Sequence, residues 1–178
     1  EGIIMDEGYT GLSMRKVAKA IGYTVGTLYL VFRNQDALLF ELNARTQDKL
    51  YNELLTSLAG QKKPVDRLQA MARCYIQFAH ENSSRWLTAF EHRPPADIET
   101  PPWLTERIQR SFTLAITELK PALPKASDAE LQKAAGALWS GVHGICVLAL
   151  TNKLDSSGVD EPETLAEYLV AVMVKGLK

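Results

Sequence analysis

The chain has 178 residues, a formal net charge of -1 at pH 7 and a hydrophobic fraction of 46%. This length suits one compact domain or two small ones, and the apolar fraction is that of a globular chain, which excludes a disordered protein. A net charge near zero also excludes a protein that binds nucleic acid through bulk positive charge alone.

Nearly all of the chain has the apolar spacing of helices, and no segment alternates with the period of two that half-buried strands require. We therefore predict an all-α fold of about nine helices. Side-chain caps mark several helix starts, because Ser, Thr and Asn at an N-cap accept a backbone N–H. We expect a first helix that ends near Gly8, three helices capped by Ser13, Thr24 and Asn34, and five more over residues 64–82, 85–92, 103–119, 127–154 and 160–177.

The chain begins without methionine, in a stretch that already has helical spacing. We therefore expect residues to be missing ahead of Glu1, with a basic arm as one candidate for them. Glu1–Gly8 has neither the basic start nor the long apolar run of a secretory signal. Cys74 and Cys146 are the only cysteines and lie in apolar helical patterns, which favours two buried thiols in the cytoplasm over a disulfide or a metal pair.

Residues 13–32 have the pattern of two short helices joined by a tight turn. Val17, Ala18 and Ile21 lie at helical spacing, and Gly22 supplies the positive φ that a sharp helix end needs. Two helices joined in this way form a helix-turn-helix, whose second helix fits the major groove of DNA. This stretch therefore predicts a DNA-binding head.

The predicted head also carries a modest basic patch. Between Tyr9 and Gln35 there is no acidic residue. The basic patch consists of Arg15, Lys16, Lys19 and Arg33. Positive charge without local acidic residues is what a module that docks on phosphates requires.

The ordered series Gly22-Tyr23-Thr24-Val25-Gly26-Thr27-Leu28-Tyr29, followed by Phe32 and Asp36-Ala37-Leu38-Leu39, resembles the head of the tetracycline-repressor (TetR) family of regulators. The resemblance implies a homodimer that binds a double-stranded, pseudo-palindromic DNA operator and releases it when a small molecule binds the C-terminal domain; repression is the family default. It divides the chain into a helix-turn-helix domain over residues 1–44 and an effector-binding and dimerisation domain over residues 45–178.

The resemblance also implies which residues face DNA. These are Ser13, Arg15, Thr24, Val25, Gly26, Thr27 and Tyr29, and Arg33 is added as a further basic group beside them. Hydroxyls suit phosphate oxygens, arginine reaches phosphate or guanine, and valine can contact a thymine methyl group. For Thr27 and Tyr29 the alternative is packing or capping within the head. Four apolar residues are assigned to the core of the head: Ala18, Ile21, Leu28 and Phe32.

The chain departs from the family pattern at three positions. Leu30 and Val31 stand where an aromatic residue and a histidine are common, and Gln35 stands where a lysine is common. Each replacement removes a potential phosphate contact, so we expect the affinity of a single head for DNA to be low.

Residues 134–152 contain no formally charged residue, so by length alone they could span a membrane. Three glycines and a central His143 argue instead for a helix buried on all sides. We expect Leu131, Leu138, Ile145 and Leu148 to face its own domain, and Ala135, Val142 and Ala149 to need a partner. Together with the last helix it would form a four-helix homodimer interface through Ala137, Gly141, Leu165, Leu169, Val172 and Met173.

The segment Trp139-Ser-Gly-Val-His143-Gly144 resembles the Trp…His-Gly signature of one class of TetR-family C-terminal domains. A pocket for an unknown small apolar effector would lie among aromatic residues of the predicted bundle, since such sites are mostly apolar. Its candidate residues are Tyr75, Phe78, Trp86, Phe90, Trp103, Phe112, Trp139 and His143. Such a set is more often a helical core than a pocket, and both interpretations stay open.

The sequence offers little support for catalysis. Glu91 and His92 are adjacent and so point to different sides of a helix, and the three histidines lack metal-ligand spacing. We predict no enzyme activity, cofactor or metal. Two alternatives remain: a helical ligand-binding or enzymatic bundle without sequence-specific DNA binding, and a DNA-binding protein whose binding is constitutive or controlled by a protein partner.

Overall fold

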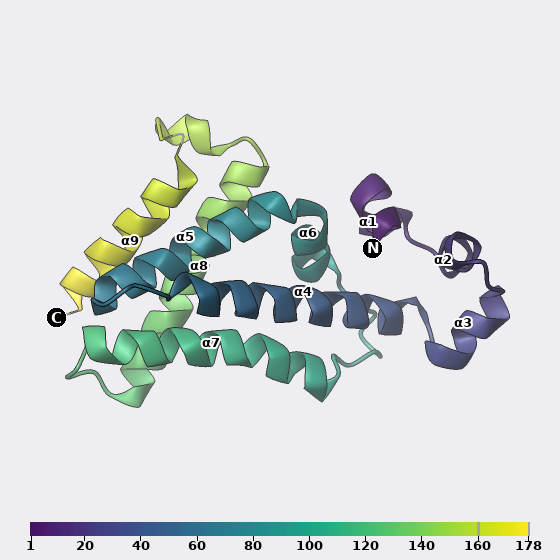
Figure 1. Cartoon of the computed structure of the whole chain (residues 1–178), viewed down its shortest axis with the longest axis horizontal. Coiled ribbons are helices and arrows are strands. Elements are labelled where there is room, and N and C mark those ends of the chain that lie inside the picture. Colours follow the sequence, from purple (N-terminus) through teal and green to yellow (C-terminus); the bar gives the residue numbers. More distant parts are fainter. Residues whose placement is uncertain (160, 178) are drawn as a thin grey trace. The chain divides into compact units, whose positions relative to one another are not determined.

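A computed structural model describes residues 1–159 and 161–177 (Figure 1). These residues form nine α-helices and two short 3₁₀ helices (η), and no strand occurs among them. The all-α prediction is confirmed. In chain order the elements are α1 Gly2–Glu7, η1 Tyr9–Gly11, α2 Met14–Ile21, α3 Val25–Val31, α4 Gln35–Ser57, α5 Pro64–Glu81, α6 Ser83–Glu91, α7 Pro102–Ala122, α8 Asp128–Leu150, η2 Leu154–Ser157 and α9 Pro162–Gly176.

The end of α8 is the clearest difference from the predicted helix bounds. We expected this helix to run to Leu154, but it ends at Leu150, where Asn152 adopts a left-handed φ of 53°. Lys153 N–H donates to the carbonyl of Leu148 at 2.8 Å, and Asn152 N–H donates to that of Ala149 at 3.1 Å. This bond pair is a Schellman motif closed by asparagine instead of glycine. The predicted last helix began at Asp160, which lies outside the described residues.

The chain divides into two compact units. Unit 1 comprises Glu1–Lys49 and Asn82–Arg107, and unit 2 comprises Leu50–Glu81 and Ile108–Lys178. Helices α4 and α7 each contribute residues to both units. The functional boundary between residues 44 and 45 stays a prediction.

The core of unit 1 holds the two helices of the predicted head together. Its buried members are Ile4, Leu12, Met14, Ala18, Leu28, Leu38 and Leu39, and Phe32 packs partly against them. The assignment of Ile21 to this core was wrong, because its side chain is 52% exposed. Helical spacing gives the direction of a side chain, but it does not say how far the neighbouring helices extend to cover it.

Unit 2 is organised around α5, α8 and α9, which pack on one another. Ala135 and Val142 of α8 are 2% and 4% exposed, so the prediction that they need a partner was wrong. Leu148 is 43% exposed and does not face its own unit as expected. Ala135 and Val142 are buried because α5 and α9 both contact α8, so that more of its circumference is covered than one apolar stripe.

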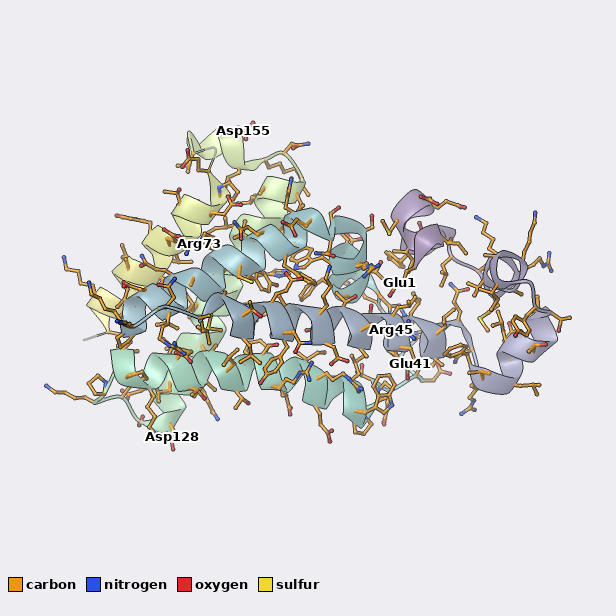
Figure 2. The ribbon with its side chains drawn as sticks, in the orientation of Figure 1. Glu1, Glu41, Arg45, Arg73, Asp128 and Asp155 are labelled. Carbon is orange, nitrogen blue, oxygen red and sulfur yellow. The ribbon has the colours of Figure 1, made fainter. Side chains whose placement is uncertain are left out.

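Charged side chains add specific contacts between the helices of unit 2. Arg67 on α5 donates to both carboxylate oxygens of Glu118 on α7, through Nε at 2.5 Å and Nη2 at 2.8 Å. Arg73, labelled in Figure 2, forms an ion pair with Glu167 of α9. Glu118 is 7% exposed, so the Arg67–Glu118 pair is the more deeply buried contact.

Candidate functional site

Local hydrogen bonds set both helices of the predicted head. Ser13 Oγ accepts the N–H of Lys16 at 3.2 Å and opens α2, and Thr24 Oγ1 accepts the N–H of Thr27 at 3.2 Å and opens α3. Gly22 ends α2 at φ 74° and ψ 24°, a left-handed conformation that costs glycine nothing. The helix-turn-helix therefore follows from contacts within a few residues of one another.

The residues predicted to face DNA lie at or near the surface of α2 and α3. Five of them are exposed: Arg15, Thr24, Gly26, Tyr29 and Arg33. Ser13, Val25 and Thr27 are half-buried, and Val25 packs partly against the head core. An exposed surface on the second helix is compatible with docking in a groove.

Two of the predicted DNA-facing hydroxyls are already engaged with each other. Thr24 Oγ1 and Thr27 Oγ1 lie 2.9 Å apart in a hydrogen bond, in addition to the cap bond. Thr27 therefore takes part in the cap at the start of α3, as the capping alternative for this residue predicts. Tyr29 is 52% exposed.

One member of the basic patch is paired within the head. Lys16 of α2 forms an ion pair with Glu7 of α1, and both side chains are about half exposed. Sequence reasoning missed this pair because Glu7 lies just outside the segment without acidic residues. Arg15, Lys19 and Arg33 remain as exposed basic groups beside α3.

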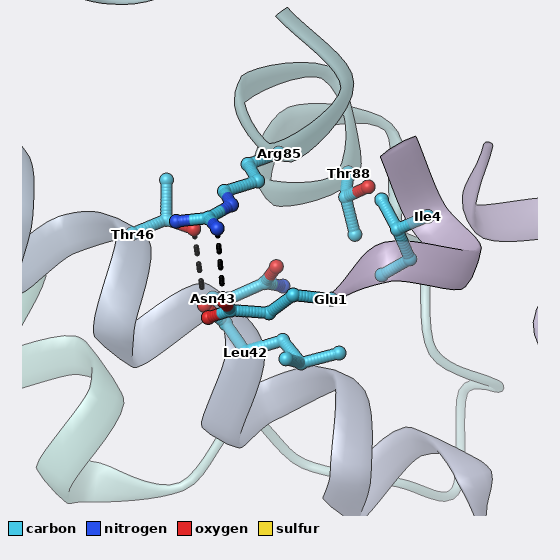
Figure 3. Close-up of a pocket in the computed structure, with 7 residues that line it drawn as sticks. All are labelled: Glu1, Ile4, Leu42, Asn43, Thr46, Arg85 and Thr88. Atoms are coloured by element: carbon cyan, nitrogen blue, oxygen red, sulfur yellow. Dashed lines mark hydrogen bonds and ion pairs between the residues drawn. The ribbon is translucent and has the colours of Figure 1, made fainter. Parts of the chain in front are cut away.

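Helix α6 and the residue after it are joined to α1 and α4 by one ion pair and one hydrogen bond. Arg85 Nη2 lies 2.8 Å from a carboxylate oxygen of Glu1, and His92 Nε2 lies 2.9 Å from Asp36 Oδ1 near the start of α4. Figure 3 shows Glu1, Arg85 and Asn43 among the residues that line a hollow. The volume of this hollow is about 10 Å³, which is room for about one water molecule. His92 therefore has a structural partner far from Glu91 in sequence.

Four of the predicted effector-site residues form one aromatic cluster in unit 2. Tyr75 Oη and His143 Nδ1 lie 3.0 Å apart, the rings of Trp139 and His143 are 5.1 Å apart, and those of Phe112 and Trp139 are 5.4 Å apart. Burial lowers the pKa of His143, so the imidazole is neutral near pH 7. A neutral histidine and a tyrosine hydroxyl are the polar groups of this otherwise apolar cluster.

The other predicted effector residues are not in that cluster. Trp86, Phe90 and Trp103 belong to unit 1, where the rings of Trp86 and Phe90 are 4.6 Å apart. Phe78 belongs to unit 2 but its side chain is fully buried. The predicted effector residues are therefore divided between unit 1 and unit 2.

Unit 2 has a hollow that sequence reasoning did not find. Its volume is about 240 Å³, and it lies among residues of α5, α8 and α9. The lining residues are Ile76, His80, Cys146, Ala149, Leu150, Pro162 and Glu163. No phenylalanine, tyrosine or tryptophan lines it, so the aromatic pattern of the sequence does not point to it.

The thiols of Cys74 and Cys146 are unreactive at neutral pH. Burial raises the pKa of Cys74 to about 11 and that of Cys146 to about 12, so both are protonated at neutral pH. The prediction that both are buried holds for Cys146, whereas Cys74 is half-buried. Among the described residues no three His, Cys, Asp or Glu side chains are grouped to hold a metal ion.

Helix α8 is long and apolar enough to cross a membrane by length and composition, and 33% of its apolar window is buried. Large apolar side chains are exposed on both α8 and α9: Trp139, Val147, Leu148, Tyr168 and Val172. Of the predicted interface residues, Ala137 and Val172 are exposed, and Gly141, Leu165, Leu169 and Met173 are half-buried. A Cβ on Gly141 would lie 2.5 Å from Leu169 Cδ2, so this glycine admits Leu169 of its own chain.

Two family models match the chain. Residues 2–42 match the model described as bacterial regulatory proteins of the tetR family, and residues 68–173 match the model described as the tetracyclin repressor-like C-terminal domain. The second match alone covers more than half of the chain. Neither description names a Trp…His-Gly class, so that assignment stays a prediction. No curated protein matches the chain.

Solved structures share the fold along nearly the whole chain. A protein of unknown function from Rhodococcus sp. RHA1 has a TM-score of 0.79 at 21% identity, covering 99% of this chain and 89% of its own. The regulator FadR from Bacillus subtilis, in complex with stearoyl-CoA, has a TM-score of 0.76 at 14% identity, covering 99% and 95%. PfmR, a TetR family transcriptional regulator from Thermus thermophilus, has a TM-score of 0.68 at 16% identity, covering 99% and 95%.

Proposed function

The chain belongs to the TetR family of bacterial regulatory proteins, and from this premise we propose that it represses transcription as a homodimer on a pseudo-palindromic DNA operator. A small apolar molecule bound in the C-terminal region would control that binding. A dimer with twofold symmetry presents two heads, so its operator carries two half-sites related by the same symmetry.

The observation that carries the proposal is the exposed surface of α3 within a complete helix-turn-helix. The helix is held from one side by Leu28 in the head core, and exposed basic residues lie at Arg15 on α2 and at Arg33, two residues after α3. Basic groups supply affinity through phosphates, while the helix in the groove supplies sequence discrimination.

The test is selection of bound sequences from random double-stranded DNA with the purified chain, followed by titration of the selected site at several salt concentrations. We expect a motif with two related half-sites and an affinity that falls as salt rises. If no motif is enriched and binding does not depend on salt, the alternative of a helical ligand-binding or enzymatic bundle replaces this proposal.

We propose that the dimer forms through the exposed apolar surface of α8 and α9. Val172 is 49% exposed there, so an acidic residue at this position should leave the fold of one chain intact and disfavour pairing. Val172→Glu is expected to convert the dimer to a monomer in analytical ultracentrifugation and to weaken operator binding. Leu55→Glu, at a 43% exposed apolar residue of α4, is the matched control. Equal effects of the two variants would contradict this interface.

For the effector, we propose an apolar molecule held by the aromatic cluster of Tyr75, Phe112, Trp139 and His143. Within unit 1, the Arg85–Glu1 ion pair and the His92–Asp36 hydrogen bond join α6 and the residue after it to α1 and α4. A displacement of α6 would be passed directly to the start of the DNA-binding head through these contacts.

Stearoyl-CoA is a suitable first compound because the FadR structure contains it, and coenzyme A is its control without the acyl chain. We expect the acyl compound to raise Tm and release operator, and Trp139→Ala to remove both effects. Ala149→Phe, which fills the 240 Å³ hollow, should have no influence. The reverse pattern would move the effector to that hollow, and no response to any apolar compound would favour constitutive binding.

A repressor of this kind acts where the chromosome is, so we propose a cytoplasmic location. TetR-family regulators are generally not enzymes. We propose no catalytic step, cofactor or metal for this chain.

A further inference from the structure

We propose that Leu30 is a specificity-determining residue that contacts the 5-methyl group of a thymine in each half-site. The inference rests on the proposed DNA-binding function and goes further, because it assigns base discrimination to a residue that departs from the common family pattern. It follows from the inventory of side chains on α3 and from the direction in which Leu30 points.

The first argument concerns what α3 lacks. Between Val25 and Val31 the helix has no arginine, lysine, asparagine, glutamine or acidic residue. The common direct contacts to guanine, adenine and cytosine edges need those side chains. Two of the hydroxyls at this helix, on Thr24 and Thr27, already bond to each other. Besides the hydrogen-bonding capacity left on these two threonines, α3 therefore offers Tyr29 and apolar residues to the bases.

The second argument concerns direction. The side of α3 that faces the head core is marked by Leu28, with Val25 and Phe32 packed partly against it. At 3.6 residues per turn, Leu30 lies about 170° around the helix from the mean direction of these three residues. Its side chain is 86% exposed, more than any other large apolar side chain among the described residues. Leu30 is thus the residue that points most directly away from the head.

The surface next to Leu30 also favours close approach to a base. Gly26 lies one turn earlier on the same face, and a helical side chain leans over the turn on its N-terminal side. A Cβ at Gly26 would meet nothing closer than Thr24 Oγ1 at 3.7 Å, so this part of the helix is bare backbone. The Leu30 side chain and the exposed backbone at Gly26 together form an apolar surface that is not crowded by other side chains.

Thymine supplies the matching chemistry. Its 5-methyl group is the one apolar feature that the four bases present in the major groove, and apolar side chains contact it. Burial of both groups removes apolar area from water, which is where the discrimination would come from. A leucine held away from the core is therefore suited to a thymine and has no polar partner to offer the other bases.

The experiment uses the full chain and the DNA site selected from random sequence. Each thymine of the site is replaced in turn by uracil, which removes only the methyl group. We expect one thymine per half-site at which a single replacement weakens binding by about fourfold, the factor that corresponds to about 0.8 kcal/mol for one buried methyl group. With Leu30→Ala, the same replacement should have almost no effect, because the methyl group has lost its partner.

Val31→Ala is the matched control variant. Val31 is 71% exposed but lies about 90° around the helix from the core direction, so it points to a different side than Leu30. We therefore expect the uracil replacement to weaken DNA binding by the Val31→Ala variant as much as DNA binding by the unaltered chain. Circular dichroism checks that Leu30→Ala remains folded, which its exposure favours. The inference fails, while DNA binding stands, if the uracil replacement weakens binding equally with leucine and with alanine at position 30. It fails likewise if the replacement weakens binding at no thymine of the site. If no site is selected at all, the proposed function itself fails.

Discussion

The Lys16–Glu7 pair leads to a prediction that the bare sequence would not suggest: removal of an acidic residue on α1 should strengthen DNA binding. Lys16 belongs to the basic patch but is held by Glu7 within the head. Glu7→Gln removes the charge and keeps nearly the same shape, so Lys16 becomes free to contact a phosphate. Because both side chains are about half exposed, the pair contributes little to stability and the fold should be unaffected.

The magnitude follows from counterion release. Each phosphate neutralised by a lysine contributes about 0.9 to the slope of log K against log salt concentration. One freed lysine in each head of a dimer therefore steepens the slope by at most about 1.8, and a doubling of salt from about 0.1 M to 0.2 M reduces the advantage of Glu7→Gln by about 3.5-fold.

The assay is fluorescence anisotropy with labelled operator at four or more salt concentrations. Asp155→Asn, on η2 in unit 2 (Figure 2), has the same effect on net charge and should leave the slope unchanged. Lys16→Ala should change the slope little by itself and should abolish the gain in the Glu7→Gln background. An identical slope for Glu7→Gln and the unaltered chain would refute the reasoning.

Three further predictions concern stability and can be read from urea or thermal unfolding. Arg67→Met leaves the carboxylate of Glu118 buried without its partner, and we expect it to lower the free energy of unfolding by about 3 kcal/mol; adding Glu118→Leu should restore most of the loss. Because burial lowers the pKa of His143, the unfolded chain binds this proton more readily, so stability should fall as pH drops below 6.5; a dependence unchanged in His143→Gln would contradict this assignment. Gly22→Ala, at φ 74°, should cost about 1 kcal/mol, whereas Gly26→Ala, where the added Cβ has space, should not destabilise.

The local architecture of the head could be predicted from the sequence because its determinants are close together along the chain. The caps at Ser13 and Thr24 each bond to a backbone N–H three residues ahead, and the turn depends on one glycine. The same holds for the capping box of Ser127 and Glu130 that opens α8. Such contacts need no knowledge of the fold, so residue types and spacing were sufficient.

The candidate site was only partly predictable. The residues predicted to face DNA follow from the motif, but the exposure of Ile21 and the Lys16–Glu7 pair depend on which helices meet. The predicted effector residues share an aromatic character, but their division between two units depends on the tertiary structure and is not visible along the chain. Asn152 ends α8 in a left-handed conformation, which an asparagine adopts less readily than a glycine, so the residue type did not indicate this helix end.

By itself the sequence determined that the chain is all-helical, where most of its helices begin, and that residues 13–32 form a helix-turn-helix, since short-range hydrogen bonds and apolar periodicity govern these features. The tertiary structure decided which sides of α8 and α9 stay exposed, which charges are paired, and that Leu30 points away from the head core. These features depend on contacts between residues far apart in the chain, such as His92 with Asp36, and a one-dimensional pattern does not contain them.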